Sequence, residues 1–149
     1  MKTYKVILMI LVSSTIFLSS CKKDDTTSST NTTTTTTITE AMTAKIDGKS
    51  WTASSVYEQD YGMMLIDGTA SDGTSIALYL PSSPTTGTHT FNSYSYSYFI
   101  EYFYSGSNYV TADSGSITIS TVNDTEIKGS FEAKTSVGDI TSGTFTAKL

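Results

Sequence analysis

Apolar and polar residues alternate with a period of two through much of the chain after residue 40. Segments 41–46 and 74–80 show this alternation, and no window shows the sustained apolar stripe of an amphipathic helix. Turns containing glycine separate the alternating segments. We count about nine or ten short strands, which predict an all-β fold. A single antiparallel β-sandwich is the expected architecture, with a lipocalin-like β-barrel as the alternative.

Two local patterns organise the predicted strands. Asp47-Gly48 is typical of a two-residue hairpin turn, because both central positions need a positive φ, and it leads into a predicted strand over 49–56. Segments 129–134 and 143–148 read GSFEAK and GTFTAK, so the last two strands echo each other. We expect their Phe and Ala side chains to face the core and their polar side chains to face outward.

The strongest strand signal runs from Tyr94 to Tyr104. If this segment is one strand, alternation places five tyrosines and Ile100 on one face and Phe99, Glu101 and Phe103 on the other. A row of tyrosines could bind sugar rings or peptides, since each ring has an apolar face and a hydroxyl. The alternative, which we favour, is that the tyrosines serve in cross-strand packing. The candidate binding residues are Tyr94, Tyr96, Tyr98, Tyr102 and Tyr104.

The N-terminus has the pattern of an export signal. Two lysines precede an apolar run of about a dozen residues, which is shorter than the roughly twenty residues needed to cross a bilayer. Leu18-Ser19-Ser20-Cys21, at the end of this run, resembles a bacterial lipobox. The resemblance implies that residues 1–20 are removed and that Cys21 is lipidated with acyl chains such as palmitate. Cys21 is the only cysteine, which also favours a role for it in processing.

Residues 21–39 are predicted to form a disordered stalk between the lipidated cysteine and an all-β domain over 40–149. Every residue from 26 to 37 is Ser or Thr except Asn31, so the segment cannot bury enough apolar surface to order itself. The charged residues after Cys21 resemble the export signal of surface lipoproteins of the Bacteroidota type. Thr26 follows Asp25 in a pattern that resembles an O-glycosylation site of that group.

Charge limits the expected partners. Cleavage before Cys21 would leave seven lysines and no arginine against 14 acidic residues. Such a chain is a poor candidate for nucleic acid, whose binding depends on lysine and arginine contacts with phosphate. It also lacks a basic patch for anionic lipid. We therefore expect contact with the membrane through the acyl chains on Cys21 alone.

The order of these features resembles a family of small lipoproteins of the Bacteroidota type that have an all-β domain. The motifs that carry the resemblance are the lipobox, the Thr/Ser stalk, residues 44–51 around Asp47-Gly48, and the Gly-Ser-Phe and Gly-Thr-Phe strands. These motifs consist of turn and core residues, so they specify a fold. The resemblance implies no activity and no catalytic residues.

Candidate catalytic chemistry is sparse. His89 is the only histidine, which excludes a zinc site built from several His or Cys ligands. Calcium could use Asp67, Asp72 and Asp113, but they lack the spacing of an EF-hand loop, and we expect no metal or other cofactor. The acids Glu58, Asp60 and Glu101 form no recognisable hydrolase motif.

We therefore expect no enzymatic activity. The leading hypothesis is a lipid-anchored outer-membrane protein on the cell surface that acts as a binding or adhesion module for a glycan or a protein. The alternative is a periplasm-facing carrier of a small hydrophobic ligand, with a β-barrel pocket lined by Met63 and Leu65 or by Met64 and Ile66. A hydrolase is a third possibility, which would need two convergent acids or His89 beside a hydroxyl.

Overall fold

The computed structural model describes residues 37–149. These residues belong to one compact unit, Thr35–Leu149. The predictions for Cys21, for Thr26 and for the signal segment lie outside the described residues.

The described chain folds into eleven strands in two antiparallel sheets. The strands are β1 (Ala41–Ile46), β2 (Lys49–Thr52), β3 (Ser55–Asp60), β4 (Met63–Thr69), β5 (Ser75–Pro81), β6 (Gly87–Asn92), β7 (Phe99–Ser105), β8 (Asn108–Thr111), β9 (Ser114–Val122), β10 (Glu126–Lys134) and β11 (Ile140–Lys148). The six-stranded sheet has the order β2-β1-β11-β10-β9-β6, and the five-stranded sheet has the order β3-β4-β5-β7-β8. No helix that could cross a membrane occurs in residues 37–149.

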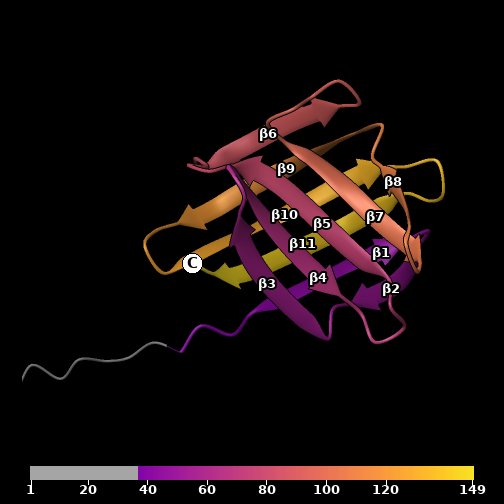
Figure 1. The fold of residues 1–149 in the computed structure, drawn as a ribbon, viewed down its shortest axis with the longest axis horizontal. Helices are drawn as coiled ribbons and strands as arrows, with labels where there is room; N and C mark the ends of the chain where they lie inside the picture. The colour runs from indigo at the N-terminus through magenta and orange to yellow at the C-terminus, as the bar shows by residue number, and fades with distance from the viewer. Residues whose placement is uncertain (1–36) are drawn as a thin grey trace, which may run out of the picture. The chain divides into compact units, whose positions relative to one another are not determined.

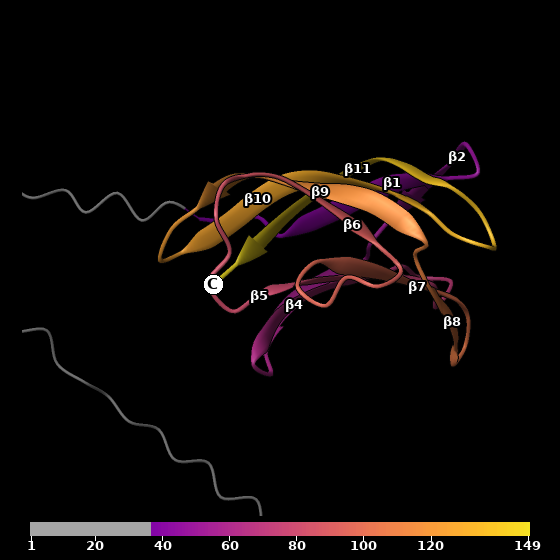
Figure 2. The same cartoon turned by 90° about the horizontal axis from the view of Figure 1, so that it is seen from above.

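The two sheets pack face to face with their strands crossing at a large angle (Figure 1). Figure 2 shows the same two layers from above, with the ends of β4 and β8 curling away from the six-stranded sheet. The sheets remain separate, so the expected β-sandwich is confirmed and the alternative of a closed barrel is wrong. The large, fully buried side chains between the sheets are Met42, Ile66, Ile76, Leu78, Leu80, Ile100, Ile117, Ile119, Ile127 and Ile140.

The first predicted hairpin is confirmed, but the strand after it is shorter than expected. Asp47 and Gly48 both have positive φ, at 49° and 74°. The predicted strand over 49–56 is two strands in different sheets, because the chain crosses the sandwich at Ala53 and Ser54. The Ala53 N–H donates to the carbonyl of Met42 in one sheet, and the Ser54 N–H donates to the carbonyl of Thr69 in the other.

The prediction of one strand from Tyr94 to Tyr104 is wrong over its first half. β7 begins at Phe99, and residues 93–98 form a loop. The cause lies at Asn92, whose side-chain Oδ1 accepts the Tyr94 N–H at 3.0 Å, while the Asn92 carbonyl accepts the Ser95 N–H at 2.9 Å. Side-chain hydrogen bonds of this kind compete with strand pairing and close a turn.

The echo between the two last strands has a structural explanation. β10 and β11 pair so that Gly129 lies opposite Phe145 and Phe131 lies opposite Gly143. Each phenylalanine ring therefore covers the glycine on the neighbouring strand. A Cβ atom built on Gly143 would lie 2.6 Å from the Phe131 ring, which leaves room only for hydrogen at that position. The pair of motifs thus forms two interlocking Gly–Phe contacts in the core.

Candidate binding face

The outer surface of the five-stranded sheet carries a group of aromatic side chains. Alternation along β4, β5 and β7 sends Ile66, Leu78 and Ile100 into the core and their neighbours outward. The strand register places the outward-facing residues in rows that run across the sheet. We call this surface the aromatic face and define it by its rings, Tyr57, Tyr79, Phe99, Phe103 and Tyr109.

The rings of the aromatic face pack against one another. Tyr79 and Phe99 stack with centroids 4.2 Å apart and planes 10° apart. Phe103 and Tyr109 lie 5.1 Å apart at a tilt of 30°. Tyr57 and Tyr109 are on the two edge strands of the sheet and are 41% and 54% exposed. The face therefore presents fixed rings in its middle and accessible rings at its edges.

Two carboxylates lie among these rings. Asp67 on β4 and Glu101 on β7 occupy the same row of the sheet, on either side of Ala77 of β5. Glu101 accepts a hydrogen bond from the Tyr79 hydroxyl at 3.0 Å. Asp67 is only 7% exposed although it points away from the core, and its Oδ1 accepts a hydrogen bond from the Thr69 hydroxyl at 3.1 Å. Flanking side chains thus cover the middle of the face.

Burial perturbs the ionisation of three groups on this surface. Burial raises the pKa of Asp67 above the usual range, and the hydrogen bond from Thr69 opposes this rise only in part. Burial also raises the pKa of the Tyr79 hydroxyl, with added contributions from the charge of Glu101 and its hydrogen bond. Burial raises the pKa of Tyr57, and the nearby charge of Asp67 adds to this effect. The leading cause of all three pKa shifts is therefore the same, the shielding of these groups from water by their neighbours.

The five tyrosines singled out in the sequence do not share one surface. Tyr94 and Tyr96 lie in the loop before β7 and are 83% and 86% exposed. Tyr98 stacks on His89 of the six-stranded sheet, with centroids 4.1 Å apart. Tyr102 faces the core, and Tyr104 tilts against it at 6.3 Å.

The sequence did not indicate the residues that form the aromatic face. On β7, Ile100 and Tyr102 are buried in the core, so the alternate residues Phe99 and Phe103 face outward. Tyr79 was visible in the sequence as the outward neighbour of Leu78 and Leu80. Its proximity to Phe99 and Glu101 depends on the pairing of β5 with β7, which are separated in the chain by β6 of the other sheet. The residues of β5 and β7 contain no local sequence pattern that predicts this pairing.

The remaining candidates for chemistry lie apart. His89 Nε2 is 2.8 Å from the carbonyl oxygen of Thr85. Glu58 and Asp60 alternate with Tyr57 on β3, so they point to the opposite side of the sheet from Glu101. Within residues 37–149 no three His, Cys, Asp or Glu side chains come close enough to hold a metal ion.

Two hollows elsewhere on the domain lack exposed rings. One, of about 580 Å³, lies against β6, β9, β10 and β11 and has a mixed lining of Ser and Thr, the charged residues Glu132, Lys134 and Asp139, and the buried apolar residues Phe91, Ala133 and Ile140. The other, of about 330 Å³, lies at one end of the sandwich beside Trp51 and Tyr102. Both of those rings are buried, and Trp51 Nε1 already donates to the Thr74 hydroxyl at 2.8 Å. The aromatic face is therefore the better candidate for binding.

The geometry defines an all-β sandwich domain with one aromatic, acidic outer face. A family model described as a domain of unknown function, DUF6252, matches residues 38–147. The chain therefore belongs to the DUF6252 family. No curated protein and no solved structure matches the chain.

Proposed function

We propose that this protein is a lipid-anchored, non-catalytic binding module displayed at the cell surface, and that it binds through the aromatic face. The observation that carries the proposal is the set of five rings around two carboxylates on the outside of a sheet. Aromatic side chains supply large contact area with little loss of conformational freedom, and binding surfaces are enriched in them. A partner that covers the exposed rings of Tyr57 and Tyr109 would bury apolar surface that now contacts water.

The proposed anchor is Cys21, as in bacterial lipoproteins of the Bacteroidota type. Lipid attached there would hold the protein in the outer membrane, since more than one acyl chain is needed for stable attachment. The Thr/Ser segment that follows in the sequence would separate the domain from the membrane. Thr26 is the proposed site of a sugar on this segment. The partner would be a protein or a glycan outside the cell.

A non-catalytic role also accounts for the hydrogen bonds of Glu101. Its carboxylate accepts the Tyr79 hydroxyl through Oε2 and lies 3.5 Å from the Thr111 hydroxyl through Oε1. These two contacts hold the carboxylate in a fixed position on the aromatic face, and each oxygen keeps a second lone pair that can accept a hydrogen bond from a ligand. The carrier hypothesis required a barrel pocket, and the separate sheets of the sandwich remove its architectural basis. Met64 and Ile66 are part of the packed core.

Paired substitutions test the binding face. The chain from residue 21, with Cys21→Ala to keep it soluble, would be applied to a glycan array and a peptide array. We expect Phe103→Ser with Tyr109→Ser to weaken binding to the recognised ligands at least tenfold, because this pair removes two touching rings of the face. Tyr94→Ser with Tyr96→Ser removes two exposed rings outside the face and should leave binding within twofold.

Thermal melts of both double variants control for unfolding. The proposal fails if Tyr94→Ser with Tyr96→Ser abolishes binding while Phe103→Ser with Tyr109→Ser does not. It also fails if neither array contains a ligand whose binding is weakened by Phe103→Ser with Tyr109→Ser.

A further inference from the structure

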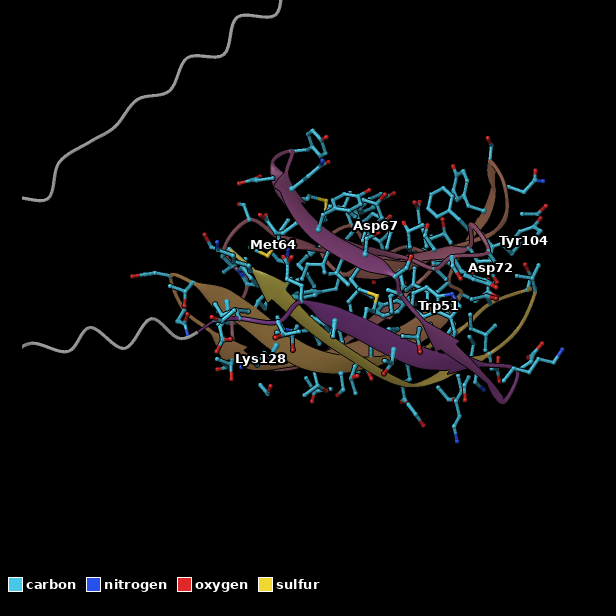
Figure 3. The ribbon with its side chains drawn as sticks, turned by 90° about the horizontal axis from the view of Figure 1, so that it is seen from below. Trp51, Met64, Asp67, Asp72, Tyr104 and Lys128 are labelled. Carbon is cyan, nitrogen blue, oxygen red and sulfur yellow. The ribbon has the colours of Figure 1, made fainter. Side chains whose placement is uncertain are left out.

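The two sheets of the sandwich differ in their ionisable side chains. The lysines of the described residues all lie on strands of the six-stranded sheet, namely Lys45, Lys49, Lys128, Lys134 and Lys148. The strands of the five-stranded sheet carry four acids and no lysine, namely Glu58, Asp60, Asp67 and Glu101. Figure 3 shows Asp67 and Lys128 on opposite sides of the sandwich. Of these acids, Asp67 and Glu101 point outward on the aromatic face, whereas Glu58 and Asp60 point to the other side of the sheet. The six-stranded sheet also carries Glu126 and Glu132, so its five lysines are partly offset. The aromatic face therefore carries negative charge and no lysine, on the side of the domain away from the lysine-bearing sheet.

Within the described residues, one of the two carboxylate oxygens of Asp67 has no hydrogen-bond donor. Its Oδ1 accepts the Thr69 hydroxyl, whereas its Oδ2 makes no side-chain hydrogen bond or ion pair within residues 37–149. No fully buried side-chain oxygen in this part of the chain lacks a partner, so Oδ2 keeps contact with the surface of the face. The ion pair found in the described residues joins Lys128 and Glu126 on the other sheet. A carboxylate that is largely shielded from water and has a free oxygen favours a donor from a partner.

We propose that the aromatic face recognises a peptide segment of a partner protein that bears arginine or lysine. The proposal rests on the proposed function and names the chemistry of its partner. Glu101 would bind the guanidinium or ammonium group directly, and Asp67 would add attraction through its charge and its free oxygen. The apolar stem and the charged plane of arginine would lie against the rings, whose faces attract cations. Charge complementarity is the reason for this choice of occupant.

A neutral glycan fits the same face less well. Its hydroxyls could donate to Glu101 and its rings could stack on Phe103 or Tyr109, but both carboxylate charges would be covered without compensation. Covering an ionised group without an opposite charge is costly. A second copy of this chain could also present lysines from its six-stranded sheet. Both occupants are distinguished by the experiment below.

The probe is a fluorescent peptide, Gly-Arg-Gly-Arg-Gly, compared with the same peptide containing citrulline, which keeps the shape of arginine and removes its charge. Binding to the soluble chain with Cys21→Ala would be followed by fluorescence anisotropy. We expect the citrulline peptide to bind at least tenfold more weakly. We expect Glu101→Gln to weaken binding of the arginine peptide at least tenfold.

Glu132→Gln is the matched control, because Glu132 is an exposed acid on the outer side of the six-stranded sheet and the net charge changes equally. It should change binding less than twofold. Asp67→Asn is the second variant, with an expected loss of threefold or more. Thermal melts would confirm that the variants are folded.

Equal binding of the arginine and citrulline peptides would overturn the inference, as would equal effects of Glu101→Gln and Glu132→Gln. Sedimentation would show whether the wild-type chain associates with itself through the face, which would replace the proposed partner with a second copy. If a neutral glycan binds and is lost in the Phe103→Ser, Tyr109→Ser variant but not in Glu101→Gln, the cationic partner is wrong while the proposed binding face stands.

Discussion

The carboxyl group of Asp67 lies on the outside of a sheet yet is largely shielded from water. Its raised pKa means that folding favours the protonated form over the ionised form. At neutral pH the ionised group therefore lowers the free energy of unfolding. As the pH falls through the raised pKa, the folded state takes up a proton before the unfolded state does, and this cost disappears.

Asp67→Asn should therefore stabilise the domain at pH 7. Asparagine keeps the shape of the side chain and can still accept the Thr69 hydroxyl, while the buried charge is gone. We expect a higher free energy of unfolding for the variant in urea at pH 7. The advantage should shrink as the pH falls and vanish below about 3.8, the ordinary value for the carboxyl group.

Glu132→Gln controls for the loss of one negative charge anywhere on the domain. If Asp67→Asn is less stable than wild type at pH 7, the ionised carboxylate of Asp67 does not lower the free energy of unfolding, and this interpretation is wrong. A variant that gains stability but loses binding is the pattern expected for a residue kept for function at some expense to the fold.

At the scale of single elements, β10 and β11 depend on their interlocking Gly–Phe contacts. In Gly143→Ala the new methyl group would meet the Phe131 ring and its main-chain oxygen, both 2.6 Å from the ideal Cβ position. We expect the variant to lose about 1–3 kcal/mol of unfolding free energy, the usual effect of overpacking a core.

Ser130→Ala is the matched control, because Ser130 lies on the exposed side of the same strand pair, opposite Thr144. It should stay within about 0.5 kcal/mol of wild type. Equal stabilities for Gly143→Ala and wild type in urea would show that the two strands can separate enough to admit a methyl group, and the close packing would not be required.

The same elements show how far the sequence predicts the fold. Alternation and turn residues predicted β1, the Asp47-Gly48 hairpin and the all-β class, because those features depend on neighbouring residues. The break between β2 and β3 was missed, although Trp51 and Val56 both face the core and are five residues apart. One strand cannot send residues at an odd spacing to the same side, so a change of phase marks the crossing.

The candidate site was less predictable than the fold. The stretch of alternating tyrosines suggested one long strand, but the local hydrogen bonds of Asn92 make its first half a loop. The aromatic face instead gathers residues from four strands, and Asp67 and Glu101 come together only through the pairing of β4, β5 and β7. Long-range pairing of this kind leaves no periodic signal in the chain.

At the scale of the whole molecule, the proposed lipid anchor would hold a domain whose two sheets differ in charge. The lysines of the described residues lie on the six-stranded sheet, whereas the outer face of the five-stranded sheet carries Asp67, Glu101 and the rings of the aromatic face and no lysine. The aromatic face would therefore bind the partner, and the lysine-bearing sheet would remain in contact with water. Display on the cell surface would make the aromatic face available to partners outside the cell.

Protease shaving of intact cells, followed by mass spectrometry, tests the proposed display most directly. Cells producing the wild-type chain would be compared with cells producing Cys21→Ala. We predict that protease releases peptides of the domain from intact wild-type cells, and that the Cys21→Ala protein is absent from the membrane fraction because its acyl chains are missing. Protection of the wild-type domain until the outer membrane is broken would contradict surface display, and membrane retention of Cys21→Ala would contradict the lipid anchor.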